Sequence, residues 1–298
     1  MVQYRGLPPG PNVGTQLKAL KRRKKQQENA QAKAARAEAT AVDDASPPSP
    51  DQTLQALSRS KLLHWFKSKG WSPFEFQLDT WQAMQANRSG LLHATTGSGK
   101  TLAVWGGALL SCAQAKRPRG AATEVMWITP MRALAVDTTK SLQATLSDWA
   151  ADKEVLCQTG DTDAATRTRI KNRPPFGLVT TPESLTLMLT RTQSLAQLNK
   201  LKVLVVDEWH ELLGNKRGVQ VQLAIARLVT MNPEVQIWGL SATLGNLESA
   251  MQALLHPVLA NSKQEGLSCP EPLLVQGKLT KDLVIDSLIP TQFVRFPW

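Results

Sequence analysis

The sequence of 298 residues predicts an α/β fold in which a mainly parallel sheet carries helices on both faces. Three observations support this fold class. Short apolar runs of strand length alternate with longer amphipathic stretches, a glycine-rich turn joins one run to a helix, and two adjacent carboxylates follow another run. The carboxyl ends of parallel strands lie at one edge of a sheet, so we expect the loops that follow the strands to lie close together.

The amino-terminal residues 1–53 are predicted to form a basic tail that is disordered or partly helical. They are rich in proline and alanine, carry a basic block at residues 21–25, and have few large apolar side chains to bury. The whole sequence has a formal net charge of +11, which favours a polyanionic partner. The tail is either a solvated extension or a basic arm that adds non-specific affinity for nucleic acid.

A helix is expected from Leu54 to just before Gly70, because apolar residues recur there at helical spacing. The next segment, residues 71–77, is rich in aromatic side chains and ends in Gln77. A glutamine amide carries a donor and an acceptor, so Gln77 can read the adenine edge, and Phe74 can stack on the base. Ordinary core packing explains the aromatic side chains equally well.

Residues 94–101, Ala-Thr-Thr-Gly-Ser-Gly-Lys-Thr, have the pattern of a phosphate-binding loop between a strand at 91–92 and a helix at 102–110. The glycines let the backbone curl so that amide groups and a helix amino terminus face phosphate groups. Lys100 is expected to reach the β- and γ-phosphates, and Thr101 to offer its hydroxyl to Mg²⁺. The candidate ATP-binding residues are Gln77, Thr96, Gly97, Ser98, Gly99, Lys100 and Thr101.

Further strands are expected at residues 124–129, 155–158 and 176–180, with a helix from Arg132 to about Trp149. Residues 181–184 should cap the next helix, with Pro182 in its first turn. The loops after these strands form a rim where hydroxyls, amides and a charge can contact a nucleic-acid backbone. The candidate contacts are Arg132, Gly160, Thr180 and Thr181, each of which is alternatively an ordinary cap or turn residue.

Asp207 and Glu208 directly follow an apolar strand at residues 203–206, which places two carboxylates at its carboxyl end. Asp207 is expected to hold Mg²⁺, and Glu208 to orient and deprotonate an attacking water. A strand at 235–238 is expected to end at residues 239–243, whose hydroxyls can bond to the 207–210 segment and sense the γ-phosphate. The candidate coupling residues are His210, Ser241 and Thr243.

Taken together, these motifs resemble a known family. The sequence Asp-Glu-Trp-His after a phosphate-binding loop, followed by Ser-Ala-Thr at 241–243, is similar to the first RecA-like motor domain of superfamily 2 helicases. More closely, the chain resembles the ligase-associated DEXH-box helicases, relatives of the large Lhr helicases. The segments that carry this resemblance are residues 71–74, 91–94, 127–130, 207–214 and 240–246.

The resemblance implies a RecA-like (P-loop NTPase) domain at residues 54–262 that uses ATP and Mg²⁺, with Lys100 and Glu208 as catalytic residues. Such enzymes are ATP-dependent 3′-to-5′ translocases on single-stranded DNA and are associated with DNA repair. By the same resemblance, single-stranded DNA is the expected partner, a DNA ligase and a nuclease are expected repair partners, and the location is cytoplasmic and nucleoid-associated. No run of 18 apolar residues predicts a membrane span.

Two departures from the family pattern affect these expectations. Thr95 replaces the usual loop proline, with a mild expected effect because the loop donates backbone amides. Residues 263–298 are expected to be edge strands and the start of a linker to a second RecA-like domain that the chain lacks, so the chain is expected to bind ATP and nucleic acid without being a competent helicase alone. The alternatives are an RNA helicase of the same superfamily and a non-catalytic nucleotide- or nucleic-acid-binding fragment.

Overall fold

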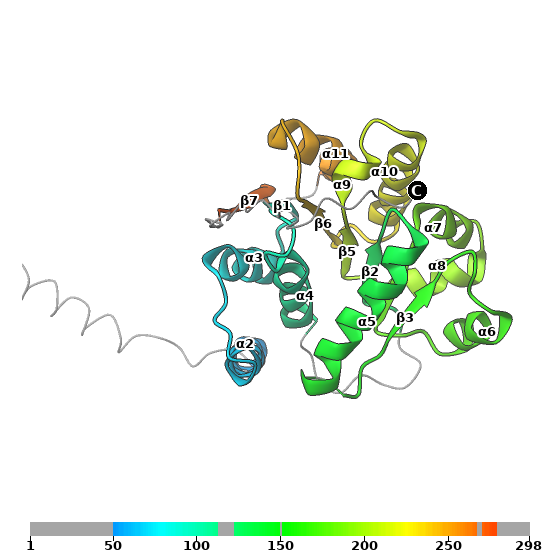
Figure 1. Cartoon of the computed structure of the whole chain (residues 1–298). Coiled ribbons are helices and arrows are strands. Elements are labelled where there is room, and N and C mark those ends of the chain that lie inside the picture. The colour runs from blue at the N-terminus through cyan, green and yellow to red at the C-terminus, as the bar shows by residue number, and fades with distance from the viewer. Residues whose placement is uncertain (1–49, 113–121, 150, 267–269, 279–298) are drawn as a thin grey trace, which may run out of the picture. The chain divides into compact units, whose positions relative to one another are not determined.

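The computed structural model describes residues 50–112, 122–149, 151–266 and 270–278 (Figure 1). Residues 1–49 of the predicted tail, and residues 267–269 and 279–298 of the predicted segment of edge strands and linker (263–298), lie outside the described residues. Residue contacts divide the chain into Met1–Thr53 and Leu54–Trp298, and the sheet and the candidate site belong to the second unit. No helix within the described ranges has the length and apolar character needed to cross a membrane.

The described residues form one sheet of seven strands, all parallel to their neighbours (Figure 1). The order across the sheet is β3-β4-β2-β5-β6-β1-β7. The strands are β1 (Gly90–Ala94), β2 (Val125–Ile128), β3 (Val155–Gln158), β4 (Gly177–Thr180), β5 (Val203–Val206), β6 (Gln236–Ser241) and β7 (Leu273–Gly277). The predicted parallel α/β fold is confirmed.

Helices cover both faces of the sheet. Successive side chains of a strand point to opposite faces, so a strand whose residues are all buried must be covered on both. In β2, Val125 and Trp127 belong to one core cluster, whereas Met126 and Ile128 belong to another. The first cluster contains side chains of α3 (Glu75–Gln85), α4 (Lys100–Ser111) and α5 (Arg132–Trp149). The second contains side chains of α6 (Ala164–Asn172), α7 (Pro182–Leu189), α8 (Thr192–Leu198), α9 (Trp209–Leu212), α10 (Lys216–Met231) and α11 (Leu247–Glu265).

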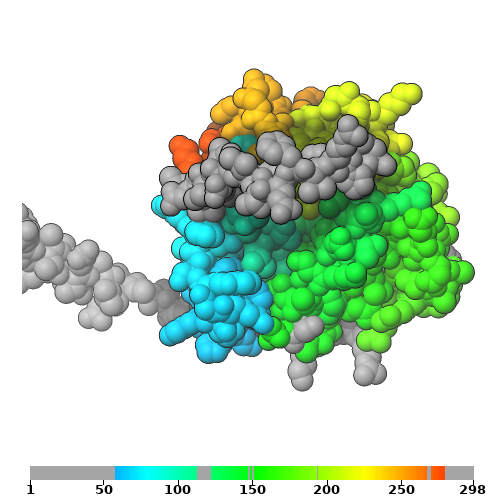
Figure 2. Space-filling model, viewed as in Figure 1, coloured from blue at the N-terminus to red at the C-terminus, as the bar shows by residue number. Residues whose placement is uncertain are grey.

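Helix α2 (Pro50–Ser68) packs outside α3 and α4 through an aromatic cluster. Trp65 and Phe66 meet the buried Trp81 there, and Trp65 Nε1 also donates to Asp148 Oδ2 of α5 at 3.2 Å. Lys69 pairs with the same carboxylate at 2.7 Å. Figure 2 shows α2 and α3, in blue to cyan, beside the green α5. These contacts hold the carboxyl-terminal end of α2 against α3 and α5.

Strand β6 is longer than the sequence pattern predicted, and the predicted end at residue 238 is wrong. Gly239 and Ser241 continue the strand, in register with Leu91 and His93 of β1. Gly239 marks a close approach rather than a turn, since an added Cβ would lie 2.6 Å from a methyl group of Leu254 in α11. The extension carries Ser241 to the carboxyl edge of the sheet.

The predicted cap of α7 is only partly correct. Thr181 stands at the N-cap position and Pro182 opens the helix, as predicted, but the Thr181 side chain makes no capping hydrogen bond. Its Oγ1 instead donates to Ser184 Oγ at 3.3 Å. The pyrrolidine ring presets the backbone dihedral of the first helical residue, which starts the helix without a side-chain cap.

Candidate nucleotide and nucleic-acid site

Three neighbouring strands bring the nucleotide motifs together at the carboxyl edge. Strands β5, β6 and β1 are adjacent in the sheet, although they are far apart in the sequence. The loop of residues 94–101 follows β1, Asp207 follows β5, and Ser241 ends β6. We call this group, comprising residues 94–101 with Asp207, Glu208, His210 and Ser241, the nucleotide edge.

The glycine loop has the backbone that phosphate binding requires. Gly97 and Gly99 have φ angles of 74° and 89°, a left-handed conformation that favours glycine. Helix α4 then begins at Lys100, so its first amide groups and the positive end of its dipole face the loop. The Lys100 side chain is buried and donates from Nζ to the carbonyls of Ala94 at 2.8 Å and Thr95 at 3.3 Å. The ammonium group is thus held beneath the loop.

Gln77 connects the aromatic segment to this loop. Its Oε1 accepts from the Phe74 amide at 2.9 Å, and its Nε2 donates to the Gly99 carbonyl at 3.1 Å. A cavity of about 540 Å³ lies beside it, lined by Trp71, Phe74 and loop glycines, and by Phe66 of α2. Phe74 stacks on Phe76 at a ring-centroid distance of 5.8 Å. The cavity has apolar walls suited to a base, while both ends of the Gln77 amide already bond to the chain.

Asp207 lies at the tip of β5 with both carboxylate oxygens fixed. Oδ1 accepts from the Glu208 amide at 2.9 Å, and Oδ2 accepts from Trp127 Nε1 of β2 at 3.0 Å. Burial, opposed by the Trp127 hydrogen bond and reinforced by the charge of Glu208, raises the pKa of Asp207 to about 6. A bound cation would offset this desolvation.

Glu208 has a strained backbone at the centre of the site. Its φ and ψ of 45° and 48° are left-handed, which costs roughly 1–2 kcal/mol for a residue with a Cβ. Its Oε2 is buried without a hydrogen-bond partner among the described residues and lies 3.4 Å from Nδ1 of His210. A strained residue with an unsatisfied buried oxygen is typical of a functional position.

His210 joins the Asp207 segment to the end of β6. Its Nδ1 lies 3.2 Å from Ser241 Oγ, so the structure brings together two of the three predicted coupling residues. The third, Thr243, is exposed, and within the described residues its side chain shares no hydrogen bond with this segment. His93 is part of the same neighbourhood, where burial and the charges of Lys100 and His210 lower its pKa.

The nucleotide edge fits a nucleotide with Mg²⁺. Ser98 Oγ, like the Glu208 oxygen, is buried without a hydrogen-bond partner among the described residues, and Thr101 lies partly exposed in the first turn of α4. Thr96 and Gly97 are exposed on the loop. A carboxylate and a hydroxyl, with phosphate oxygens and waters, form the set of oxygen ligands that Mg²⁺ prefers.

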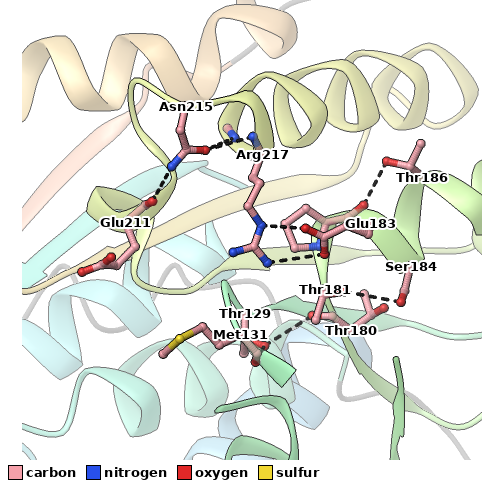
Figure 3. A network of polar contacts seen from close by, with 12 residues as sticks. Thr129, Met131, Thr180, Thr181, Glu183, Ser184, Thr186, Glu211, Asn215 and Arg217 are labelled. Carbon is pink, nitrogen blue, oxygen red and sulfur yellow. Dashed lines mark hydrogen bonds and ion pairs between the residues drawn. The ribbon is translucent and has the colours of Figure 1, made fainter. Parts of the chain in front are cut away.

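The loops after β2, β3 and β4 form a second group, which we call the phosphate rim: Arg132, Gly160, Asp161, Thr180 and Thr181. The exposed Arg132 pairs with Asp161 at 2.7 Å. Its guanidinium also lies close to Gly160, since a Cβ added to that glycine would be 3.1 Å from Nη2 of Arg132. Thr180 and Thr181 are buried beside Thr129 and Ser184 (Figure 3). Thr180 Oγ1 donates to the Gln158 carbonyl at 2.7 Å, so the two threonine hydroxyls serve the fold, and their contact with phosphate stays a prediction.

Trp127 is a residue of the site that the sequence pattern does not indicate. The pattern predicts only a buried strand there, yet the indole N–H of Trp127 donates to the Asp207 carboxylate. The available signal was the residue type, because a buried tryptophan usually finds a partner for its N–H. The partner itself depends on the pairing of β2 with β5, which no local pattern shows.

Comparisons with known proteins agree with this geometry. A family described as DEAD/DEAH box helicase matches residues 74–250. The chain is 35% identical over 202 residues to the Lhr helicase/probable uracil glycosylase of Mycolicibacterium smegmatis, covering 64% of this chain and 13% of that protein. It is 30% identical over 248 residues to the ATP-dependent helicase Lhr-Core of Methanothermobacter thermautotrophicus, covering 80% and 28%.

A solved helicase structure has a similar fold. The Mycobacterium smegmatis helicase Lhr bound to ssDNA and AMP-PNP superposes with a TM-score of 0.61 at 29% identity, over 74% of this chain and 28% of that one. The chain therefore spans between about an eighth and just over a quarter of the length of these relatives.

Proposed function

Because the chain belongs to the DEAD/DEAH box helicase family, we propose that it is the ATP-binding motor domain of an ATP-dependent helicase that moves on single-stranded DNA. The observation that carries the proposal is the nucleotide edge itself. A left-handed glycine loop, a buried lysine, a strained acid and a histidine–serine contact converge there from three adjacent strands. A chance glycine turn accounts for the loop but not for the convergence.

Each residue has a proposed role. Lys100 leaves the loop carbonyls to bind the β- and γ-phosphates, and the loop amides with Ser98 bind the remaining phosphate oxygens. Thr101 and Asp207 hold Mg²⁺, which would neutralise charge that develops on the γ-phosphoryl group. Glu208 orients the attacking water and accepts its proton. His210 and Ser241 transmit the position of Glu208 to β6.

The nucleic acid is proposed to be single-stranded DNA that lies along the phosphate rim. Arg132 is the exposed cation of this rim, and it can exchange Asp161 for a phosphate group with little loss because both side chains are in water. The relative of known structure in M. smegmatis is bound to ssDNA. A role in DNA repair, a second RecA-like domain that completes the catalytic cleft, and ligase and nuclease partners follow from the family resemblance.

Equilibrium binding tests the proposal directly. We expect the chain to bind a fluorescent ATP analogue in a Mg²⁺-dependent way, and Glu208→Gln to retain this binding. Anisotropy with a labelled oligonucleotide should show tighter binding of single-stranded DNA than of RNA of the same sequence. Nucleotide binding that does not depend on Mg²⁺ would contradict the proposed roles of Thr101 and Asp207. Tighter binding of RNA than of single-stranded DNA would show that RNA is the substrate.

A further inference from the structure

A basic groove lies away from the nucleotide edge, between α6, α7 and α8. It has a volume of about 240 Å³, and the buried Ile170 and Met188 lie among its lining residues. Three cationic side chains line it, from Arg167 and Lys171 of α6 and from Arg191 at the start of α8. The two helices lie against each other, since Gln197 Nε2 of α8 donates to the Lys171 carbonyl at 2.7 Å (Figure 1).

Among the residues that the structure describes, no carboxylate neutralises the charges of this groove. Among the described residues, no carboxylate forms an ion pair with Arg167, Lys171 or Arg191, and no carboxylate lines the groove. Neighbouring cations differ: Arg169 of α6 pairs with Glu154 at 2.7 Å. Clustered cations that repel one another without a counter-charge favour an anionic ligand.

The groove is continuous with the phosphate rim. Arg167 donates from Nη2 to the Gly160 carbonyl at 2.7 Å, while Arg132 approaches Gly160 near its Cβ position. Gln158, the last residue of β3, also lines the groove and accepts from Thr180. A chain of phosphates that contacts Arg132 can therefore continue past Gly160 toward α6 and α8.

We propose that this groove binds the phosphates of the same single-stranded nucleic acid, beyond the contacts of the rim. The inference rests on the proposed function and extends its binding path. Among the described residues, no aromatic side chain on which a base could stack lines the groove, so the contact is to the backbone and is independent of sequence. A serine hydroxyl and a glutamine amide, from Ser194 and Gln197, supply the additional polar surface.

The test compares two double variants of equal charge. Lys171→Gln/Arg191→Gln removes groove cations, whereas Lys140→Gln/Arg169→Gln removes cations that pair with Asp137 and Glu154 outside the groove. Affinities for single-stranded DNA of increasing length are measured at several salt concentrations. The groove variant should lose about 1.4 from the slope of log affinity against log salt, at about 0.7 per phosphate. Between 50 and 200 mM salt its affinity should fall about sevenfold less than that of the wild type.

Length dependence separates the groove from the rim. Wild type and control variant should gain affinity as the oligonucleotide grows past the rim, and the groove variant should lose that gain while binding short oligonucleotides normally. Equal slopes for groove and control variants overturn the inference and leave the proposed function intact. If the wild type binds no single-stranded DNA at all, both the inference and the proposed function are wrong. Polyglutamate serves as a second, protein-like polyanion. If the groove variant loses affinity for polyglutamate but not for single-stranded DNA, the groove binds an acidic protein and the inference is wrong.

Discussion

The nucleotide edge and the phosphate rim share one edge of the sheet but are built in opposite ways. At the nucleotide edge, Glu208 has a left-handed backbone, and polar oxygens of Glu208 and Ser98 are buried without hydrogen-bond partners among the described residues. At the rim, Arg132 is exposed and paired, and the Thr180 hydroxyl is satisfied by the chain.

This difference indicates different relations between binding and stability. Burying carboxylates and leaving oxygens unsatisfied destabilises the free protein, and a ligand that supplies the missing partners recovers that free energy on binding. An exposed ion pair adds little stability, so the rim can release Asp161 and bind a phosphate with little effect on the fold. Changes at the edge should therefore alter stability and nucleotide binding together, whereas changes to the exposed rim pair, Arg132 and Asp161, should alter only nucleic-acid binding.

The largest expected effect is on the pH dependence of the unfolding free energy of the nucleotide-free protein. Burial raises the pKa of Asp207 from 3.8 to about 6, so the folded state binds this proton more readily than the unfolded state. The charged form therefore lowers the unfolding free energy by about 3 kcal/mol above pH 6, and this cost falls as the pH drops through 6 and is gone only below 3.8. The difference in unfolding free energy, Asp207→Asn minus wild type, should be larger by most of that amount at pH 7 than near pH 4.

Taking this difference between two proteins removes the contribution of His93. The pKa of His93 is lowered, so its effect has the opposite sign, but it is present in both proteins. Urea unfolding at each pH gives the two free energies. A difference that does not change between pH 4 and pH 7 would show that Asp207 is not desolvated.

The second largest effect is expected from Lys100→Ala, which should weaken nucleotide binding. Loss of hydrogen bonds from a buried cation to phosphates costs about 1.5–3 kcal/mol, which is about 10- to 150-fold in affinity. Lys140→Ala is the matched control, because Lys140 is exposed on α5 and only 3.9 Å from its partner Asp137. Titration with a fluorescent ATP analogue compares them. Equal nucleotide affinities of the two variants would show that Lys100 does not bind the phosphates.

Two buried tryptophans provide a sharper test of the edge. Trp127 and Trp105 pack edge to face at 6.4 Å, but only Trp127 donates to Asp207, while Trp105 Nε1 has no hydrogen-bond partner among the described residues. Both Trp→Phe changes should reduce stability through lost packing. Only Trp127→Phe should raise the Mg²⁺ concentration needed for half-maximal nucleotide binding, by about tenfold, as for other partners that orient metal ligands.

The contradictory result is a similar Mg²⁺ requirement for the two tryptophan variants. It would show that Trp127 acts through core packing and that its hydrogen bond does not position Asp207.

The smallest effect is expected at the rim. Arg132→Ala removes an exposed ion pair and should change unfolding free energy by less than about 1 kcal/mol. It should lower the salt slope of single-strand binding by about 0.7, the contribution of one phosphate contact. Nucleotide affinity should not change. A large loss of stability would contradict the view that the exposed Arg132–Asp161 pair contributes little to the fold.

Most of the fold and of the candidate motifs were predictable because their signals are local. Helix α5 begins at Arg132 and ends at Trp149, and two left-handed glycines, Gly97 and Gly99, lie within the predicted loop. Apolar runs and glycine turns show where elements lie along the chain, and parallel strands bring their following loops to one edge.

What escaped prediction depends on contacts between distant segments. The order of the strands places Trp127 next to Asp207, and the packing of α11 on β6 explains Gly239. Gln77 was predicted to read the adenine edge through its amide, yet that amide also joins Phe74 to Gly99. The residue type shows which functional group is present, but only the fold determines the hydrogen-bond partner of that group in the free protein.

Hydrogen–deuterium exchange of the chain with each ligand tests the central claim most directly. We expect a Mg²⁺-bound, non-hydrolysable ATP analogue to slow exchange at residues 95–101 and 207–210, and single-stranded DNA to slow exchange at residues 131–132 and 159–162. Protection of the same segments by both ligands, or none at residues 95–101 with the nucleotide, would contradict the division of this edge into a nucleotide site and a phosphate rim.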